Sequence, residues 1–264
     1  MSDSGGNSLF ATTIFNPALL SKDALVRGFV AHQDLLERFL DDLRLNDGKN
    51  PAQHRLLIGQ RGLGKTTLLR RIAFAVEDDP GLCRTWIPLV FPEEQYNVKN
   101  LGDFWLNCAD ALGDALERMG EQKEADLLDE KVASISTDPR ARSEQALACL
   151  VDECGRLHRG LLLLVDNIDI VLDRLDNQEE WEFRRIISER SCLYFIGASS
   201  RALEAVYDHG RAFYDYFEIS DIKGLTDEET FTLLDHVAQQ AGDAHVQQHL
   251  KEKPERIRAL RVLT

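Results

Sequence analysis

The sequence predicts a three-layer α/β protein, in which helices cover both faces of a five-stranded, mostly parallel sheet. Five short apolar runs, typical of buried strands, alternate with longer segments whose apolar residues recur at helical spacing. From residue 224 onwards only helical patterns remain, which indicates a second, smaller unit. We therefore expect a flexible N-terminal segment over residues 1–24, an α/β core over 25–223 and the start of a truncated, all-helical lid over 224–264.

The elements of this core follow from local patterns. The predicted strands are Arg55–Ile58, Thr85–Phe91, Leu161–Val165, Cys192–Ala198 and Phe217–Ser220. Helices are predicted over residues 35–43, 65–77, 101–119, 122–134, 143–158 and 181–189. The Thr-Asp-Glu-Glu segment at residues 226–229 is a capping-box pattern, which predicts a helix to about residue 240. Further helices are expected over 245–251 and 254–263.

The composition limits the classes of partner. The chain has 264 residues, 44% of them hydrophobic and 29% charged, as in an ordinary soluble globular protein. Its net charge of −14 repels nucleic-acid phosphates, so we expect no direct nucleic-acid binding by this acidic chain. No apolar run is long enough to cross a membrane, and the N-terminus lacks a secretory signal. Five scattered cysteines indicate reduced thiols, and we expect a cytoplasmic location.

A glycine-rich segment between the first strand and the next helix carries the strongest chemical signal. Residues Gly59, Gln60, Arg61, Gly62, Leu63, Gly64, Lys65 and Thr66 fit the pattern GxxxxGK[ST] at every constrained position. Glycines let the backbone curl so that N–H groups point at phosphate oxygens, and the helix N-terminus adds positive potential. Lys65 would contact the β- and γ-phosphates, and the Thr66 hydroxyl would ligate Mg²⁺. With Thr67, this segment predicts a P-loop core that binds ATP and Mg²⁺.

An acidic residue at the end of a second buried strand completes the predicted metal site. The apolar run Leu161–Val165 leads directly into Asp166, and the run resembles a Walker B element. An aspartate in this position either holds the metal or caps the following turn. Beside a P-loop, we expect the metal role, with Thr66 and Asp166 as the protein ligands of Mg²⁺.

The residue that activates water is left open by the sequence. Asn167 follows Asp166, and an amide has no useful basicity near neutral pH. Asp169 is one candidate base, and Glu93 or Glu94 after the second strand is another. Slow turnover, with the nucleotide acting as a switch, is therefore an open alternative.

Two further positions are candidates for contacts with the γ-phosphate. Ser199 or Ser200 follows the fourth strand and would act as a sensor, unless it only forms a turn. Arg211 precedes the fifth strand and would act across a subunit interface as an arginine finger. The alternative for Arg211 is an ordinary surface arginine.

In this order, the elements resemble the AAA+ ATPase core of the origin-initiator and STAND-like kind, over about residues 29–263. Residues 27–36 are similar to the segment F-V-G-R-x-x-E-L of those proteins, which implies that Phe29 and Val30 line the base pocket. Ala31 and His32 replace the glycine and arginine of that pattern. Residues 166–169 resemble the string D-[DEN]-h-D, and residues 221–229 resemble the start of the helical lid, L-x-P-L-T-x-E-E.

The resemblance also implies a function. It implies an ATP-hydrolysing switch module that self-associates through its core or through attached C-terminal domains, in DNA transactions, mobile-element control or defence signalling. The Gly-Gly-Asn-Pro-Arg segment that follows such a lid in relatives is not in this chain, so we expect the N-terminal part of a larger protein. Two alternatives remain: a nucleotide-dependent interaction scaffold with little or no hydrolysis, and a small-molecule kinase.

Overall fold

The computed structural model describes residues 20–46, 48, 52–91, 97–201, 204–240 and 248. The chain divides into two compact units. The larger unit is Arg38–Ile222, and the smaller one combines residues 20–37 with the segment that starts at Lys223. The smaller unit holds helices α2 (Lys22–Gly28) and α12 (Asp227–Gln240), while α3 (Gln33–Leu45) contains residues of both units.

The larger unit is built on a parallel sheet of five strands. The strands are β1 (Arg55–Ile58), β2 (Trp86–Val90), β3 (Gly160–Val165), β4 (Leu193–Ser199) and β5 (Glu218–Asp221). Their order is β2-β3-β4-β1-β5, and every pair of neighbours in the described residues is parallel. The predicted five-stranded sheet is therefore confirmed. Strand β4 lies between β1 and β3, so the end of β4 lies between the ends of the two strands with the predicted phosphate and metal motifs.

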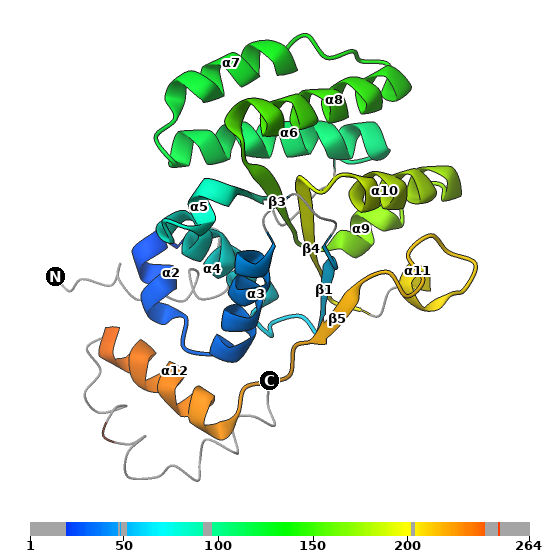
Figure 1. Ribbon diagram of the computed structural model, residues 1–264. Helices are drawn as coiled ribbons and strands as arrows, with labels where there is room; N and C mark the ends of the chain where they lie inside the picture. The colour runs from blue at the N-terminus through cyan, green and yellow to red at the C-terminus, as the bar shows by residue number, and fades with distance from the viewer. Residues whose placement is uncertain are drawn as a thin grey trace, which may run out of the picture. The chain divides into compact units, whose positions relative to one another are not determined.

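Helices cover both faces of the sheet (Figure 1). One face packs against α6 (Leu101–Arg118), α8 (Pro139–Leu157) and α10 (Asn177–Glu189), and α7 (Gln122–Val132) lies beside α6 and α8. An aromatic cluster fills this layer, with Phe183 contacting Phe104, Trp105 and Phe195 at ring-centroid distances of 5.0 to 5.8 Å. Because strand side chains alternate, the other face is available to α4 (Lys65–Asp78), which contacts β2 and β3. The short helices are α5 (Leu82–Thr85), α9 (Ile168–Leu172) and α11 (Glu204–Tyr207).

Two helices begin earlier than the apolar periodicity predicted. Helix α8 begins at Pro139 instead of residue 143, because Asp138 caps it by accepting the Ala141 N–H at 3.0 Å. Helix α10 begins at Asn177 instead of residue 181, because Asp176 and Glu179 form a capping box. In both cases polar capping residues extend the helix beyond its apolar face. The helices predicted over 245–251 and 254–263 lie outside the described residues, apart from Gln248.

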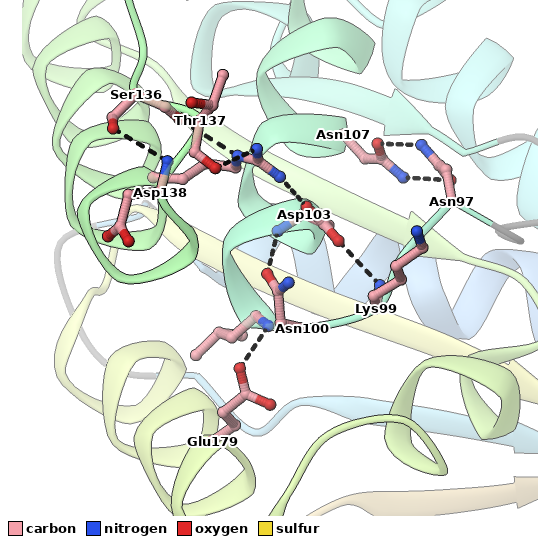
Figure 2. Close-up of polar contacts among 11 residues, drawn as sticks. Asn97, Lys99, Asn100, Asp103, Asn107, Ser136, Thr137, Asp138 and Glu179 are labelled. Atoms are coloured by element: carbon pink, nitrogen blue, oxygen red, sulfur yellow. Dashed lines mark hydrogen bonds and ion pairs between the residues drawn. The ribbon is translucent and has the colours of Figure 1, made fainter.

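A polar junction joins the beginnings of α6, α8 and α10 (Figure 2). Asn100 caps α6 by accepting the Asp103 N–H at 2.9 Å. The buried Asp103 carboxylate forms an ion pair with Arg142 of α8. On the other side, Glu179 of α10 accepts the Leu101 N–H at 3.0 Å. These contacts fix the start of α6 against two neighbouring helices.

Candidate functional site

The glycine-rich loop joins β1 to α4 in the conformation that its sequence predicts. Gly62 and Gly64 have φ values of +84° and +87°, a region that side-chain-bearing residues rarely adopt. Gly64 is the N-cap of α4 and supplies no capping side chain. The N–H groups of the first helical turn have no partner within the helix, so this end of α4 is suited to receive an anion.

Lys65 is buried at the start of α4, with only 6% of its surface exposed. Its ammonium donates hydrogen bonds to the carbonyl oxygens of Gly59 at 2.6 Å and Gln60 at 2.9 Å. Burial lowers the pKa of Lys65, and the carboxylates of Asp166 and Asp169 oppose this shift. The side chain is therefore a positive charge held inside the loop and close to two acidic residues.

The two predicted Mg²⁺ ligands lie in direct contact. The Thr66 hydroxyl donates a hydrogen bond to Asp166, which is only 4% exposed. The other carboxylate oxygen of Asp166 accepts the Asn167 N–H at 2.8 Å. Among the residues with described positions, no cluster of three or more His, Cys, Asp or Glu side chains is arranged to hold a metal. A hydroxyl and one carboxylate do fit Mg²⁺, which commonly takes one or two protein oxygens and completes its shell with phosphate and water.

Asp169 and Ser199 meet between the ends of β3 and β4. The fully buried Ser199 hydroxyl donates to the Arg201 carbonyl at 2.8 Å and lies 3.3 Å from one oxygen of Asp169. Arg201 donates through Nε to the other oxygen at 3.2 Å, and its guanidinium also pairs with Asp173. The candidate base Asp169 therefore lies beside Ser199 and is held in an ion pair by Arg201. Arg201 is a residue of this site that sequence patterns alone do not single out, and its place two residues after Ser199 is the signal that points to it.

Asn167 occupies a backbone conformation that explains its residue type. Its φ and ψ are 48° and 45°, in the left-handed region, at the N-cap of α9. Asparagine tolerates this region better than most residues other than glycine. The left-handed backbone conformation after Asp166 therefore accounts for an asparagine at position 167 without a catalytic role.

The structure does not bring the other predicted residues into contact with the phosphate loop or Asp166 within the described contacts. Arg211 makes a two-point ion pair with Glu180 of α10, whose side chain is only 1% exposed. Phe29 is buried and Val30 half-buried in the smaller unit, so their predicted role at the base pocket stays a prediction. Glu93 and Glu94 lie outside the described residues.

Helix α12 begins as the sequence predicted. Glu229 accepts the Thr226 N–H at 2.7 Å, and the Thr226 hydroxyl accepts the Glu229 N–H at 3.1 Å. Glu229 also accepts the His32 N–H at 3.1 Å. Although burial opposes it, these donors hold the pKa of Glu229 below its usual value. The capping box thus also joins α12 to the segment before α3, within the smaller unit.

Comparisons with known proteins place the fold among ATPases. No protein-family model and no curated protein matches the chain. Among solved structures, it is similar to a Walker-type ATPase of Pyrococcus abyssi, with a TM-score of 0.52, 13% identity, and coverage of 84% of this chain and 63% of that one. The ORC2 protein of Aeropyrum pernix, in ADPNP and ADP complexes, matches with a TM-score of 0.56, 16% identity, and coverage of 86% and 55%. The ORC1 protein of the same organism, in complex with DNA, matches with a TM-score of 0.57, 17% identity, and coverage of 86% and 53%.

These matches establish the fold of the chain. The predicted similarity to origin-initiator-type ATPase cores is confirmed at that level. The chain spans 53% to 63% of the length of the three matched proteins. Within the described part of the chain, no helix combines the length and apolar character that a membrane span needs.

Proposed function

We propose that this chain binds ATP with Mg²⁺ through residues 59–67 and Asp166, and that it hydrolyses ATP as a switch module. The observation that carries this proposal is the contact between Thr66 and Asp166 beside the buried Lys65. A bound triphosphate with Mg²⁺ requires ligands for the metal and a positive charge beside the phosphates. The hydroxyl and the carboxylate would be the metal ligands, and the ammonium would supply the charge. The fold shared with P-loop ATPases supports the same assignment.

The residues of the site would divide the work as follows. The loop N–H groups and Lys65 hold the β- and γ-phosphates in place. Mg²⁺, held by Thr66 and Asp166, would neutralise charge on those phosphates when bound. Ser199 would orient Asp169 or the attacking water from the end of β4. Arg201 donates one hydrogen bond to Asp169, so Asp169 would accept a proton on a lone pair that this bond leaves free.

A second function is favoured by the same contacts. Because Asn167 is no base and Asp169 is engaged in an ion pair with Arg201, the chain would bind ATP firmly and hydrolyse it slowly. The nucleotide would then control an interaction scaffold. In either case we place the chain in a larger cytoplasmic protein that self-associates and acts in DNA transactions or in STAND-like defence signalling.

Nucleotide binding and phosphate release test the two functions together. Lys65→Ala and Asp166→Ala should each weaken Mg²⁺-dependent ATP binding by at least about tenfold in calorimetric titration, since each removes a charge from the phosphate and metal site. The matched controls Lys123→Ala and Asp152→Ala remove exposed charges on α7 and α8 and should bind as the unchanged chain does.

Steady-state phosphate release then separates the switch from the scaffold. Turnover that disappears in Lys65→Ala and Asp166→Ala supports hydrolysis at this site and rejects the scaffold. Firm binding with no phosphate release above background rejects the ATPase and supports the scaffold. If ATP binding is unaffected by both substitutions, the site itself is wrongly assigned.

A further inference from the structure

The first residue of the phosphate loop leaves the sheet between two neighbouring strands. Ile58, the last residue of β1, pairs with Ser199 on one side and with Asp221 on the other. The next residue, Gly59, donates its N–H to the Ser199 carbonyl at 3.2 Å. On the other side, the Ile222 N–H donates to the Ile58 carbonyl at 2.7 Å. Gly59 and Ile222 therefore lie side by side, each directly after a strand of the parallel sheet.

Gly59 is packed so closely that space explains its residue type. A methyl group on Gly59 would lie 2.9 Å from the Ile222 carbonyl oxygen and 3.2 Å from the Ile222 Cβ. Both distances are shorter than the roughly 3.5–4.0 Å at which non-bonded heavy atoms attract one another best. Gly62 and Gly64 have positive φ values and Gly59 does not, so backbone conformation does not demand a glycine at position 59. Ile222, which is only 4% exposed, is the closest neighbour of that position.

The carbonyl of Gly59 carries this packing to the proposed phosphate site. It accepts a hydrogen bond from the Lys65 ammonium at 2.6 Å. The N–H of Gly59 is held by Ser199, its α-carbon lies against Ile222, and a shift of Gly59 would therefore move the oxygen that holds Lys65. In contrast, a methyl group on Gly62 would have nothing within 4 Å. The loop thus has a packed first residue and an open middle.

Ile222 is also the last residue of the larger unit. Lys223 begins the segment that belongs to the smaller unit. The chain that connects β5 to α12 therefore passes through the residue that packs on Gly59. Only Ile222 and Gly59 lie between this connection and the ammonium of Lys65.

We propose that Ile222 is a positioning residue of the phosphate loop, which fixes Gly59 and thereby the ammonium of Lys65. It acts through the backbone of Gly59 and needs no contact with the nucleotide. A displacement of the chain at Lys223 would shift Gly59 and change the affinity for ATP, and a nucleotide that engages Lys65 would in turn change the hold on Ile222. The inference rests on the proposed function, since ATP is taken as the ligand of the loop.

Calorimetric titration of the full chain with Mg²⁺ and ATP tests this role. Gly59→Ala should weaken binding at least about tenfold, because the methyl group displaces the loop from Ile222. Ile222→Ala should weaken it by roughly three- to tenfold, whereas Ile222→Val keeps the branched Cβ and should stay within about twofold of the unchanged chain. Ile186→Ala on α10 is the matched control, because Ile186 is a buried isoleucine in another part of the core. It should bind ATP as the unchanged chain does, at a temperature where all variants are folded.

Hydrogen exchange of the Ile222 amide, measured by NMR without nucleotide, reports the packing directly. Gly59→Ala should accelerate this exchange at least about tenfold, because it disturbs the hydrogen bond to the Ile58 carbonyl. Gly62→Ala is the control within the same loop. It should weaken ATP binding but leave the exchange of Ile222 unchanged, since its methyl group meets nothing within 4 Å.

The proposal is overturned if Gly59→Ala or Ile222→Ala binds ATP as tightly as the unchanged chain, or if Ile186→Ala weakens binding as much as Ile222→Ala does. Equal exchange of the Ile222 amide in Gly59→Ala and in the unchanged chain also overturns it. If Lys65→Ala leaves ATP binding unaffected, the proposed function fails instead, and the exchange measurement still decides whether Ile222 holds Gly59. Should Gly59→Ala fail to fold, the comparison of Ile222→Ala with Ile222→Val decides.

Discussion

The ion pair between Arg211 and Glu180 gives the sharpest test of a residue that the sequence assigned to function. Arg211 is a candidate arginine finger or an ordinary surface arginine by its sequence position, and two of its guanidinium nitrogens, Nε and Nη2, donate to Glu180 within the chain. The Glu180 side chain is 1% exposed, whereas that of Arg211 is 34% exposed. Replacing Arg211 by alanine would therefore leave a buried carboxylate without this partner.

The expected cost follows from these exposures. Removing one partner of a fully buried ion pair costs about 3–5 kcal/mol. Because Arg211 is one-third exposed, water can reach the space it leaves and solvate Glu180 in part. We therefore expect Arg211→Ala to lower the free energy of unfolding by about 2 kcal/mol. For a domain of this size the melting temperature should fall by about 4–8 °C.

Urea unfolding of four variants measures this value. In the background Glu180→Gln, which removes the buried charge, the cost of Arg211→Ala should fall by about 1 kcal/mol. Arg185→Ala is the control, on the helix α10 that also carries Glu180. Both side chains of the Arg185–Glu189 pair are exposed, so this pair should contribute less than about 0.5 kcal/mol to the free energy of unfolding. If Arg211→Ala unfolds at the same urea concentration as the unchanged chain, the structural role of the pair is refuted. An ATPase rate per folded molecule that drops by orders of magnitude at unchanged stability would instead support the arginine finger.

Two other substitutions test the loop and the core. Gly62→Ala places a methyl group in open space at a φ of +84°, so backbone strain should lower the free energy of unfolding by about 1–2 kcal/mol and weaken ATP binding. The control Gly155→Ala, in open space on α8, should stabilise the chain by up to about 1 kcal/mol and leave ATP binding unchanged. Burial lowers the pKa of His54, despite its contact with the Ile187 carbonyl, so the unfolded chain binds a proton at higher pH than the folded chain does. Stability should therefore be complete above about pH 7 and fall below pH 6.5 by at most about 1.4 kcal/mol per pH unit. Urea midpoints from pH 8 to 5 should fall less steeply for His54→Gln, and equal slopes would contradict this assignment.

The parts of the fold that could be predicted are those encoded by neighbouring residues. The run from Leu161 to Asp166 and the segment from Gly59 to Thr66 specify strand, loop and helix within a few positions, and the structure places them as expected. The capping box at Thr226 is equally local. The starts of α8 and α10 were missed, because their caps lie outside the apolar faces on which the prediction relied.

Contacts between distant residues could not be predicted in this way. Arg201 contacts Asp169 across 32 positions, and Arg211 contacts Glu180 across 31. Periodicity shows which face of an element is buried, but it does not show which charge will lie opposite another. The order of the sheet decides this, because β4 lies beside β3 and brings the residues after it close to those after Asp166.

The pairing of β3 with β4 also bears on how the proposed switch would work. Asp169 lies beside Ser199, the last residue of β4, and pairs with Arg201 two residues further on, whereas Lys65 and Thr66 begin α4 after the loop that follows β1. A phosphate group held by the loop would present negative charge beside Lys65, and Arg201 is the exposed cation nearest in sequence to Ser199. Any attraction between that phosphate and Arg201 must compete with the carboxylates of Asp169 and Asp173. If hydrolysis proceeds through Asp169, a phosphate that draws Arg201 away from Asp169 would couple nucleotide binding to this ion-pair network.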